Sequence, residues 1–523
     1  MAGYSRFDQL PVSVSRSAPG SLPSQLAEQV RSLIVGGFLV AGDSLPSTRA
    51  LSERLNVSRG TVVFAYEQLV GEGYLVTGNG GTRVADSLSF RAMTPGNPGA
   101  RSPAALELLP ARQAQVGRGV LVTSQPTPAE TTQAPLDLRP GSPNTALLAS
   151  ATWRSAWRAA AASPGTSYPA AGSPQLRSQL VEHLRLVRSV LCDPDDLLVT
   201  AGARDGFRLV LTALRRRVRN RPLRIAVEDP GYPSLHRIPL TFGHEILPIP
   251  VDADGLDPSC LPGGDRQPDL VLVAPSHQYP LGASMPVARR LELLAWAREH
   301  GALIVEDDYD SELRYTGDPL PALASLDRPS LPGGAQLHPS RWGSDRVITL
   351  GSFAKMLAPG LALGYLLVPS HLREDLLELR SDLGNPVSTV VQDAMTSFLA
   401  AGGVRRHTAR MRRVYKGRRE QVIEALADVN GVRALPMDGG LHAVLHLPAA
   451  DDLTEETLVA RAAATGVLVA PLGNYWSSRS HMGQAMPGAS PLYGLVVGFG
   501  GVGDRQLGAG LALLRGVLTA WGG

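Results

Sequence analysis

From about residue 136 onward, short apolar runs alternate with segments of helical period, and this alternation limits the fold more than any other feature of the sequence. Short apolar runs are typical of strands buried on both faces, and helices between them supply the crossovers that parallel strands need. We therefore predict a large α/β domain with a mainly parallel sheet. Its candidate strands are Leu197–Thr200, Arg224–Val227, Leu270–Val273, Ala302–Val305, Val347–Leu350 and Leu363–Val368.

Polar or glycine-containing segments follow these runs, at the edge where open α/β sheets bind ligands. The first run leads into Gly202, Ala203 and Arg204 at the start of a predicted helix, whose free N–H groups could hold a phosphate. Tyr232 follows the second run, and an acidic cluster containing Asp307 and Tyr309 follows the fourth. Buried carboxylates need a cationic partner or a bound cation, so this cluster indicates a site.

Lysine is almost absent from the chain: only two of its 50 basic residues are lysines. Lys355 lies between two candidate strands, whereas Lys416 lies in an arginine-rich helical segment. An arginine cannot replace a primary amine that reacts with an aldehyde. We therefore predict a chemical role for Lys355 and interpret Lys416 as a surface cation; that both are accidental survivors is the alternative.

An amine, a buried carboxylate, aromatic rings and a phosphate-binding turn are together what pyridoxal 5′-phosphate requires. The residues that supply them are Lys355, Asp307, Tyr309, Tyr232, Ser352, Gly202, Ala203 and Arg204. Taken singly, each has an ordinary structural explanation, and only their joint occurrence favours the cofactor. No catalytic residue is assigned.

The first 85 residues have a different pattern, with helices predicted over Leu22–Val35, Ser47–Leu55 and Ser58–Val70. A short helix, a tight turn and a longer helix form a helix-turn-helix, and the segments Tyr74–Thr77 and Thr82–Ala85 predict a hairpin wing. Residues 86–135 have the composition of a flexible linker. The predicted domains are therefore 1–85 and 136–523.

Bulk properties exclude several classes of protein. No apolar run is long enough to span a bilayer, and the N-terminus lacks the pattern of a signal peptide, so a cytoplasmic location is expected. Cys192 and Cys260 are too few for a disulfide framework or a zinc site and are interpreted as buried thiols. The arginines between residues 405 and 419 are interpreted as a solvated helix face, and the alternative is that part of this face contacts DNA or the small N-terminal domain.

The N-terminal segment resembles the winged-helix domain of the GntR superfamily, over Gly42–Leu51, Asn56–Val62, Ala65–Leu69 and Glu72–Leu75. The resemblance implies that double-stranded DNA is contacted by Ser47, Arg49, Ser58, Arg59, Thr61 and the wing residue Gly80. A protein-interaction module without DNA binding is the alternative. Residues 1–85 contain seven arginines and six acidic residues. Because so small a positive charge attracts DNA only weakly, we expect a dimer that binds two half-sites.

Residues 137–520 resemble fold type I aminotransferases, and the fusion resembles the MocR subfamily of regulators. This resemblance implies a regulator that is no enzyme, senses pyridoxal phosphate and possibly an amine effector, and forms a homodimer with swapped DNA-binding domains. It also implies that Tyr168 reaches the cofactor phosphate of the partner subunit, so that the sites are shared.

Two departures from the family pattern bear on the cofactor. Relatives have serine before the lysine and arginine seven residues after it, where this chain has Ala354 and Ala362. Arg204 is the candidate for replacing that arginine at the phosphate. The alternatives are an active aminotransferase with a vestigial DNA module, and a regulator whose altered pocket senses another ligand.

Overall fold

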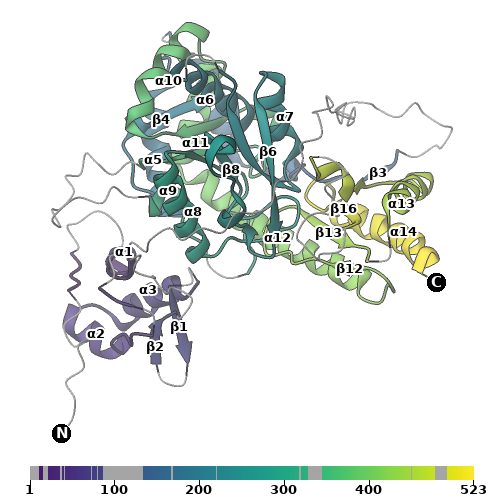
Figure 1. The fold of residues 1–523 in the computed structure, drawn as a ribbon, viewed down its shortest axis with the longest axis horizontal. Helices are drawn as coiled ribbons and strands as arrows, with labels where there is room; N and C mark the ends of the chain where they lie inside the picture. The colour runs from purple at the N-terminus through teal and green to yellow at the C-terminus, as the bar shows by residue number, and fades with distance from the viewer. Residues whose placement is uncertain are drawn as a thin grey trace. The chain divides into compact units, whose positions relative to one another are not determined.

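The computed structural model describes residues 11–15, 22–35, 38–40, 42–71, 74–78, 81–85, 134–166, 169–218, 221–316, 320–327, 344–448, 450–477 and 492–522. The chain divides into two compact units, one built on residues 1–62 and 76–134 and the other on residues 63–75 and 135–523. Each unit is described by itself (Figure 1).

The N-terminal segment has the predicted three helices and hairpin. Ser47 caps the second helix by accepting a hydrogen bond from the Ala50 N–H, and Asn56 takes a left-handed conformation (φ 51°) that turns the chain toward the third. The hairpin strands pair with each other. These elements are α1 (Leu22–Val35), α2 (Thr48–Leu55), α3 (Arg59–Gly71), β1 (Leu75–Gly78) and β2 (Gly81–Val84).

The larger unit contains an eight-stranded sheet in the order β4-β11-β10-β9-β8-β5-β6-β7. Its strands run parallel except β11 and β7, so the predicted parallel sheet is confirmed with two antiparallel additions. Their bounds are β4 (Leu197–Thr200), β5 (Arg224–Asp229), β6 (Glu245–Asp252), β7 (Gly255–Leu256), β8 (Leu270–Val273), β9 (Leu303–Asp308), β10 (Val347–Ser352) and β11 (Gly364–Leu367).

Helices cover both faces of this sheet (Figure 1). On one face, apolar side chains of the strands pack against α6 (Ala203–Arg217), α7 (Pro233–Thr241) and α10 (Ser370–Leu383). The opposite face is covered by α5 (Pro174–Arg188), α8 (Val287–His300) and α9 (Leu323–Leu326), with α4 (Ala151–Ala162) and α11 (Thr389–Ala400) packed beyond α5. Because strand side chains alternate in direction, neighbouring residues of one strand face different helices.

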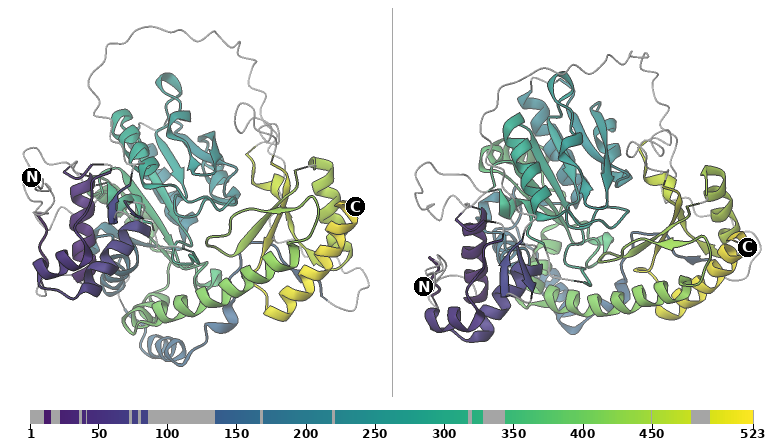
Figure 2. Two further views of the ribbon diagram at one scale, coloured as in Figure 1. Left: turned by 90° about the horizontal axis from the view of Figure 1, so that it is seen from below. Right: turned by 60° about the horizontal axis from the view of Figure 1, so that its bottom comes forward.

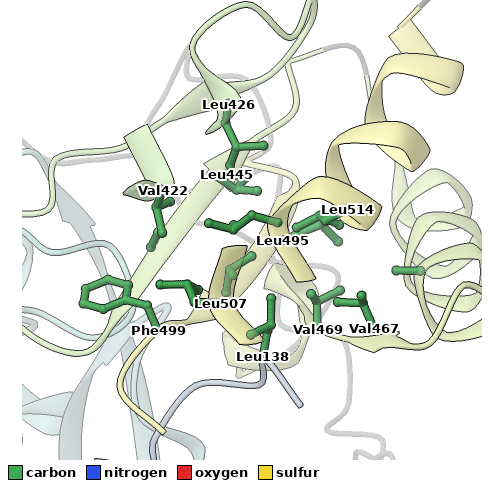
Figure 3. Packing of buried hydrophobic residues seen from close by; sticks show 14 of the residues in the cluster. Leu138, Val422, Leu426, Leu445, Val467, Val469, Leu495, Phe499, Leu507 and Leu514 are labelled. Atoms are coloured by element: carbon green, nitrogen blue, oxygen red, sulfur yellow. The ribbon is translucent and has the colours of Figure 1, made fainter. Parts of the chain in front are cut away.

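A second sheet, in the order β12-β13-β16-β15, forms a C-terminal subdomain. Leucines and valines from its strands and helices converge on one apolar core (Figure 3), and α12 (Gly403–Leu426) runs to it from the eight-stranded sheet (Figure 2). Its elements are β12 (Arg433–Ala434), β13 (His442–His446), α13 (Asp452–Ala464), β14 (Val467–Leu468), β15 (Ala470–Pro471), β16 (Gly494–Gly498) and α14 (Asp504–Gly522), and β14 pairs with β3 (Leu136–Asp137).

Two expectations were wrong. Cys260 is exposed, because it ends a short surface turn at Pro258–Cys260, whereas Cys192 is half-buried and burial raises the pKa of its thiol. Arg418 is buried and does not lie on a solvated face: its guanidinium donates to the carbonyls of Phe499 and Gly500 and to Asp504, which ties α12 to the loop after β16. Among the described helices, none combines the length and apolar character needed to cross a membrane.

Leu445→Ala is expected to lower the free energy of unfolding by about 2–5 kcal/mol, because the fully buried side chain of Leu445 leaves a cavity in the C-terminal core. The matched control is Leu453→Ala on α13, where the leucine is 70% exposed and truncation removes little packing. Urea denaturation followed by circular dichroism measures both. Equal midpoints for the two variants would contradict the packing described here.

Candidate cofactor site

The predicted cofactor residues of the described chain come from the carboxyl ends of parallel strands at one edge of the eight-stranded sheet. Gly202 and Ala203 follow β4, Tyr232 follows β5, Asp307 is the last residue but one of β9, and Lys355 follows β10. The strand pairing brings Asp307 beside Leu350 on β10. These segments, far apart in the sequence, therefore meet in one place, as the strand-end pattern predicted.

Lys355 is half-buried and points at the backbone. Its Nζ donates a 2.6 Å hydrogen bond to the carbonyl oxygen of Gly141 and lies 5.9 Å from the ring centroid of Tyr232. Gly141 has a φ of +113°, and a Cβ at that position would stand 3.2 Å from the Lys355 Nζ. A glycine is thus required for the chain to approach the amine so closely.

Asp307 and Asp308 leave β9 on opposite faces of the sheet. On the α5 face, Arg188 is buried with its Nε 2.9 Å from Asp308 Oδ2, and its Nη2 is 3.8 Å from Glu306. Arg188 is therefore the cation that the acidic cluster was expected to need. Among the described residues, no side chain forms an ion pair with Asp307, and its Oδ1 is buried without a hydrogen bond.

Burial raises the pKa of Asp307 to about 8, the charges of Asp308 and Asp310 add to the rise, and the Lys355 ammonium opposes it. Glu228, at the end of β5, behaves similarly. Its Oε2 accepts a hydrogen bond from the Ala274 N–H, and among the described residues its Oε1 has no partner at hydrogen-bond geometry. Burial raises its pKa to about 8 with a contribution from Asp307, while hydrogen bonds from Ala274 and Gln278 oppose the rise. Two buried carboxyl groups of the site therefore have raised pKa values, and the Lys355 ammonium offsets only part of the rise at Asp307.

Tyr309 is tied to the loop after β8. Its hydroxyl donates to the backbone carbonyl of His277 and lies 2.9 Å from His277 Nδ1, which in turn lies 2.8 Å from Asp310 Oδ2. Burial raises the pKa of Tyr309 well above its ordinary value, and Asp310 adds to this effect. The Tyr309 hydroxyl is therefore kept protonated and oriented, and it can donate to a ligand oxygen by giving up its bond to the His277 carbonyl.

Aromatic rings form one wall. Tyr232 packs edge-on against Tyr279 with ring centroids 5.2 Å apart, and Tyr279 packs against Tyr475 at 5.4 Å. His442 lies 4.7 Å from Tyr279, and its Nε2 is 2.8 Å from the Pro280 carbonyl. Burial lowers the pKa of His442 to about 3, so this wall is uncharged.

The start of α6 forms the other end of the site. Gly202 precedes the helix with a φ of +87° and open space where a Cβ would point, so ligand atoms can approach its backbone closely. Arg204, in the first turn, is exposed and donates a 3.0 Å hydrogen bond to Ser234 Oγ. Ser352 Oγ accepts a hydrogen bond from the Ala354 N–H, and Ala362 occupies a left-handed turn (φ 44°) in place of an arginine.

These groups fit pyridoxal phosphate. An unpaired buried carboxylate suits the pyridine nitrogen, an amine suits the aldehyde, an oriented hydroxyl suits the ring oxygen, and a helix N-terminus with a nearby arginine suits the phosphate. The unpaired Oδ1 of Asp307 carries most weight, because such an atom is costly unless a ligand supplies a donor.

The predicted DNA-contacting residues lie on α2 and at the start of α3. Arg49 is exposed and 3.1 Å from Glu53, and the hydroxyls of Ser58 and Thr61 are 2.9 Å apart at the start of α3. Arg59 donates from its Nε to the Thr48 hydroxyl, and Ser47 is the cap of α2 already described. Gly80, and likewise Tyr168 of the cofactor set, lie outside the described residues.

Sequence reasoning missed four contributors to the cofactor site: Gly141, Arg188, Glu228 and His442. Gly141 acts through a backbone carbonyl, for which no side-chain pattern exists. Glu228 directly precedes Asp229 at the end of β5, and this pair of acids in an otherwise apolar strand was a usable indication of buried carboxylate chemistry.

Fold and site define a protein that joins a winged helix to an aminotransferase-like domain, and comparisons with known proteins agree. Residues 22–84 match the model of the gntR family of bacterial regulatory proteins, and residues 139–475 match that of aminotransferase class I and II.

Full-length relatives share both parts. The chain is 42% identical over 94% of its length, and 94% of the relative's, to the HTH-type pyridoxine biosynthesis transcriptional regulator PdxR of Corynebacterium glutamicum. It is 32% identical over 97% of its length, and 96% of the relative's, to the probable rhizopine catabolism regulatory protein MocR of Rhizobium meliloti. The chain belongs to the MocR-type family of transcriptional regulators.

Solved aminotransferases share the fold of the larger unit. An archaeal alanine:glyoxylate aminotransferase superimposes with a TM-score of 0.64 at 20% identity, covering 74% of this chain and 92% of that one. The multiple substrate aminotransferase of Thermococcus profundus gives 0.62 at 23% identity, covering 75% and 92%. These likenesses establish the fold alone.

The two buried carboxyl groups predict how stability depends on pH. Because the folded pKa values of Asp307 and Glu228 are raised to about 8, the folded state holds protons that the unfolded state releases near pH 4. Their contribution is complete below about pH 4 and is lost as the pH rises to about 8. The melting temperature of the cofactor-free protein is expected to fall over this range more steeply than that of Asp307→Asn/Glu228→Gln. Parallel pH profiles would contradict this.

Proposed function

We propose that this regulator binds DNA through its winged helix and responds to pyridoxal phosphate held in its aminotransferase-like domain. The observation that carries the proposal is the unpaired, buried carboxylate of Asp307 beside the amine of Lys355. The most similar relatives named above are regulators, and one of them is named for pyridoxine biosynthesis. A cytoplasmic location follows from a role at DNA.

In this proposal the described residues have distinct roles. When bound, pyridoxal phosphate supplies an aldehyde that reacts with amines and a ring that accepts electrons. Asp307 would provide the counter-charge for the ring nitrogen, and the Tyr309 hydroxyl would exchange its bond to the His277 carbonyl for one to the ring oxygen. Tyr232 covers the ring with its aromatic face. Lys355 provides the amine and exchanges its hydrogen bond to Gly141 for the ligand.

The phosphate is assigned to the start of α6, where Gly202 and Ala203 offer backbone N–H groups and Ser352 a hydroxyl. We further propose a homodimer with shared sites and swapped winged helices, in which Tyr168 reaches the partner's phosphate, and an amine as second effector. Regulation then requires that ligand binding favours one arrangement of the winged helices over another, because a ligand with equal affinity for both shifts nothing.

Lys355→Ala is expected to abolish the visible absorption that the wild-type protein gains on incubation with pyridoxal phosphate, and to abolish the effect of the cofactor on DNA affinity. For the absorption spectra, Lys416→Ala is the matched control, because it removes the only other lysine, which is exposed on α12. Absorption spectra and DNA titrations with and without the cofactor measure both effects. A wild-type protein that gains no absorption would refute the cofactor proposal and leave DNA binding standing.

Arg204→Gln is expected to weaken cofactor binding about tenfold or more, because Arg204 is assigned the phosphate contact that Ala362 cannot make, and charge-assisted hydrogen bonds contribute about 1.5–3 kcal/mol. The control is Arg208→Gln on the same helix, where the exposed arginine pairs with Asp205. Absorption titration gives both dissociation constants. Equal values for Arg204→Gln and the wild-type protein would exclude Arg204 from the phosphate site.

A further inference from the structure

Over residues 405–416, the outer face of α12 consists almost entirely of cationic side chains, and we name this stretch the basic face; the exposed acids Glu420 and Glu424 follow it on the same helix. All its members are exposed, and they are Arg405, Arg406, Arg410, Arg412, Arg413 and Lys416. The residues between them on the opposite side of the helix, including Met411 and Tyr415, are buried. Neither the cofactor site nor the winged helix uses these cations.

Helical geometry makes the basic face continuous. Residues three and four positions apart lie on the same side of a helix, so Arg406, Arg410 and Arg413 form one row and Arg405, Arg412 and Lys416 a neighbouring one. With a rise of about 1.5 Å per residue, the rows extend over about 16 Å. The result is a ridge of positive charge several side chains long.

The protein supplies these charges with almost no counter-charge. Residues 403–419 contain eight basic residues and no acidic one. Among the described residues, no side chain forms an ion pair with any member of the basic face. The charge of Arg405 contributes to lowering the pKa of Glu182 on α5, but Glu182 forms its ion pair with Arg185, at 2.7 Å. An unneutralised ridge of this kind repels itself and fits an anionic partner.

The other two arginines of this stretch have structural roles, which separates them from the basic face. Arg418 is buried against the loop after β16, and Arg419 donates from Nε to the Met437 carbonyl at 2.7 Å. Packing therefore accounts for Arg418 and Arg419 but gives no reason for the six exposed cations.

We propose that the basic face of α12 is a second DNA-binding surface, which contacts phosphates of the duplex that the winged helix holds. Arginine-rich ridges suit a phosphate backbone, whose charges are dense and regularly spaced. The winged helix keeps that polyanion at a high effective concentration near the rest of the same chain. Further cations would add to the affinity of the winged helix for DNA, because its Arg49 forms an ion pair with Glu53 and its Arg59 donates a hydrogen bond to Thr48.

The test compares two quadruple variants of the full-length protein. One removes charge from the basic face, with Arg405→Gln, Arg406→Gln, Arg410→Gln and Arg413→Gln. The matched control removes the same charge from exposed arginines elsewhere in the larger unit, with Arg433→Gln, Arg461→Gln, Arg505→Gln and Arg515→Gln. The probe is a long duplex carrying the sequence that the wild-type protein selects from a random pool, titrated at several salt concentrations.

The basic-face variant is expected to bind the duplex about tenfold more weakly, with a salt dependence reduced by about one phosphate contact for each arginine that touches DNA. The control variant is expected to keep both values. Binding and salt dependence equal to the control would overturn the proposal. A basic-face variant that sediments as a monomer while the wild-type protein is a dimer would also overturn it, because the face would then join two copies of the chain.

The proposal rests on DNA binding by the winged helix, and a second variant separates the two. Arg59→Ala is expected to lose selectivity for the chosen duplex but to retain salt-sensitive binding to unrelated duplex DNA, and adding the four basic-face changes should remove that remainder. Retention of the remainder in the combined variant would refute a role for α12. A wild-type protein that selects no sequence would instead refute the function of the winged helix.

Discussion

The buried ion pair of Arg188 with Asp308 and Glu306 is the interaction on which the site depends. A strand that ends in three consecutive acids cannot be buried unless charge is compensated, and breaking such a pair typically costs 3–5 kcal/mol. Because strand residues alternate, Arg188 neutralises the acids on one face of β9, and on the other face the Lys355 ammonium only partly offsets the burial of Asp307. The same arrangement that allows the strand to fold thus leaves one carboxylate in need of a cationic ligand.

Around that carboxylate, the order of the strands determines the site more than the residue types do. The order of parallel strands brings the start of α6, the ring of Tyr232 and the loop of Lys355 to one edge, and backbone groups of Gly141 and Gly202 complete it. Loss of arginine at Ala362 changes one contact without changing this framework. A regulator can therefore keep an aminotransferase-like architecture while the contacts that serve turnover are altered.

Much of this could be predicted from the sequence. β4 and β8 have the predicted bounds, because a short apolar run between polar segments is typical of a buried strand that begins and ends with the run. Arg188 could not be assigned, since an arginine near a helix end resembles a solvated one until the sheet is placed. Arg418 was misjudged, although it continues the buried stripe of Met411 and Tyr415 at helical spacing. Contributions from backbone carbonyls, such as that of Gly141, leave no trace in side-chain patterns.

The helix α12 is unbroken over its 24 residues, so its two halves must turn together. Its first turn is packed closely enough that a Cβ at Gly403 would overlap the ring of Phe398 on α11, while Val422 and Leu426 belong to the core of the C-terminal subdomain. α12 therefore connects the packing against α11 directly to the core of the C-terminal subdomain. Because α12 is continuous, a rotation of the C-terminal subdomain would be transmitted along the helix to the basic face.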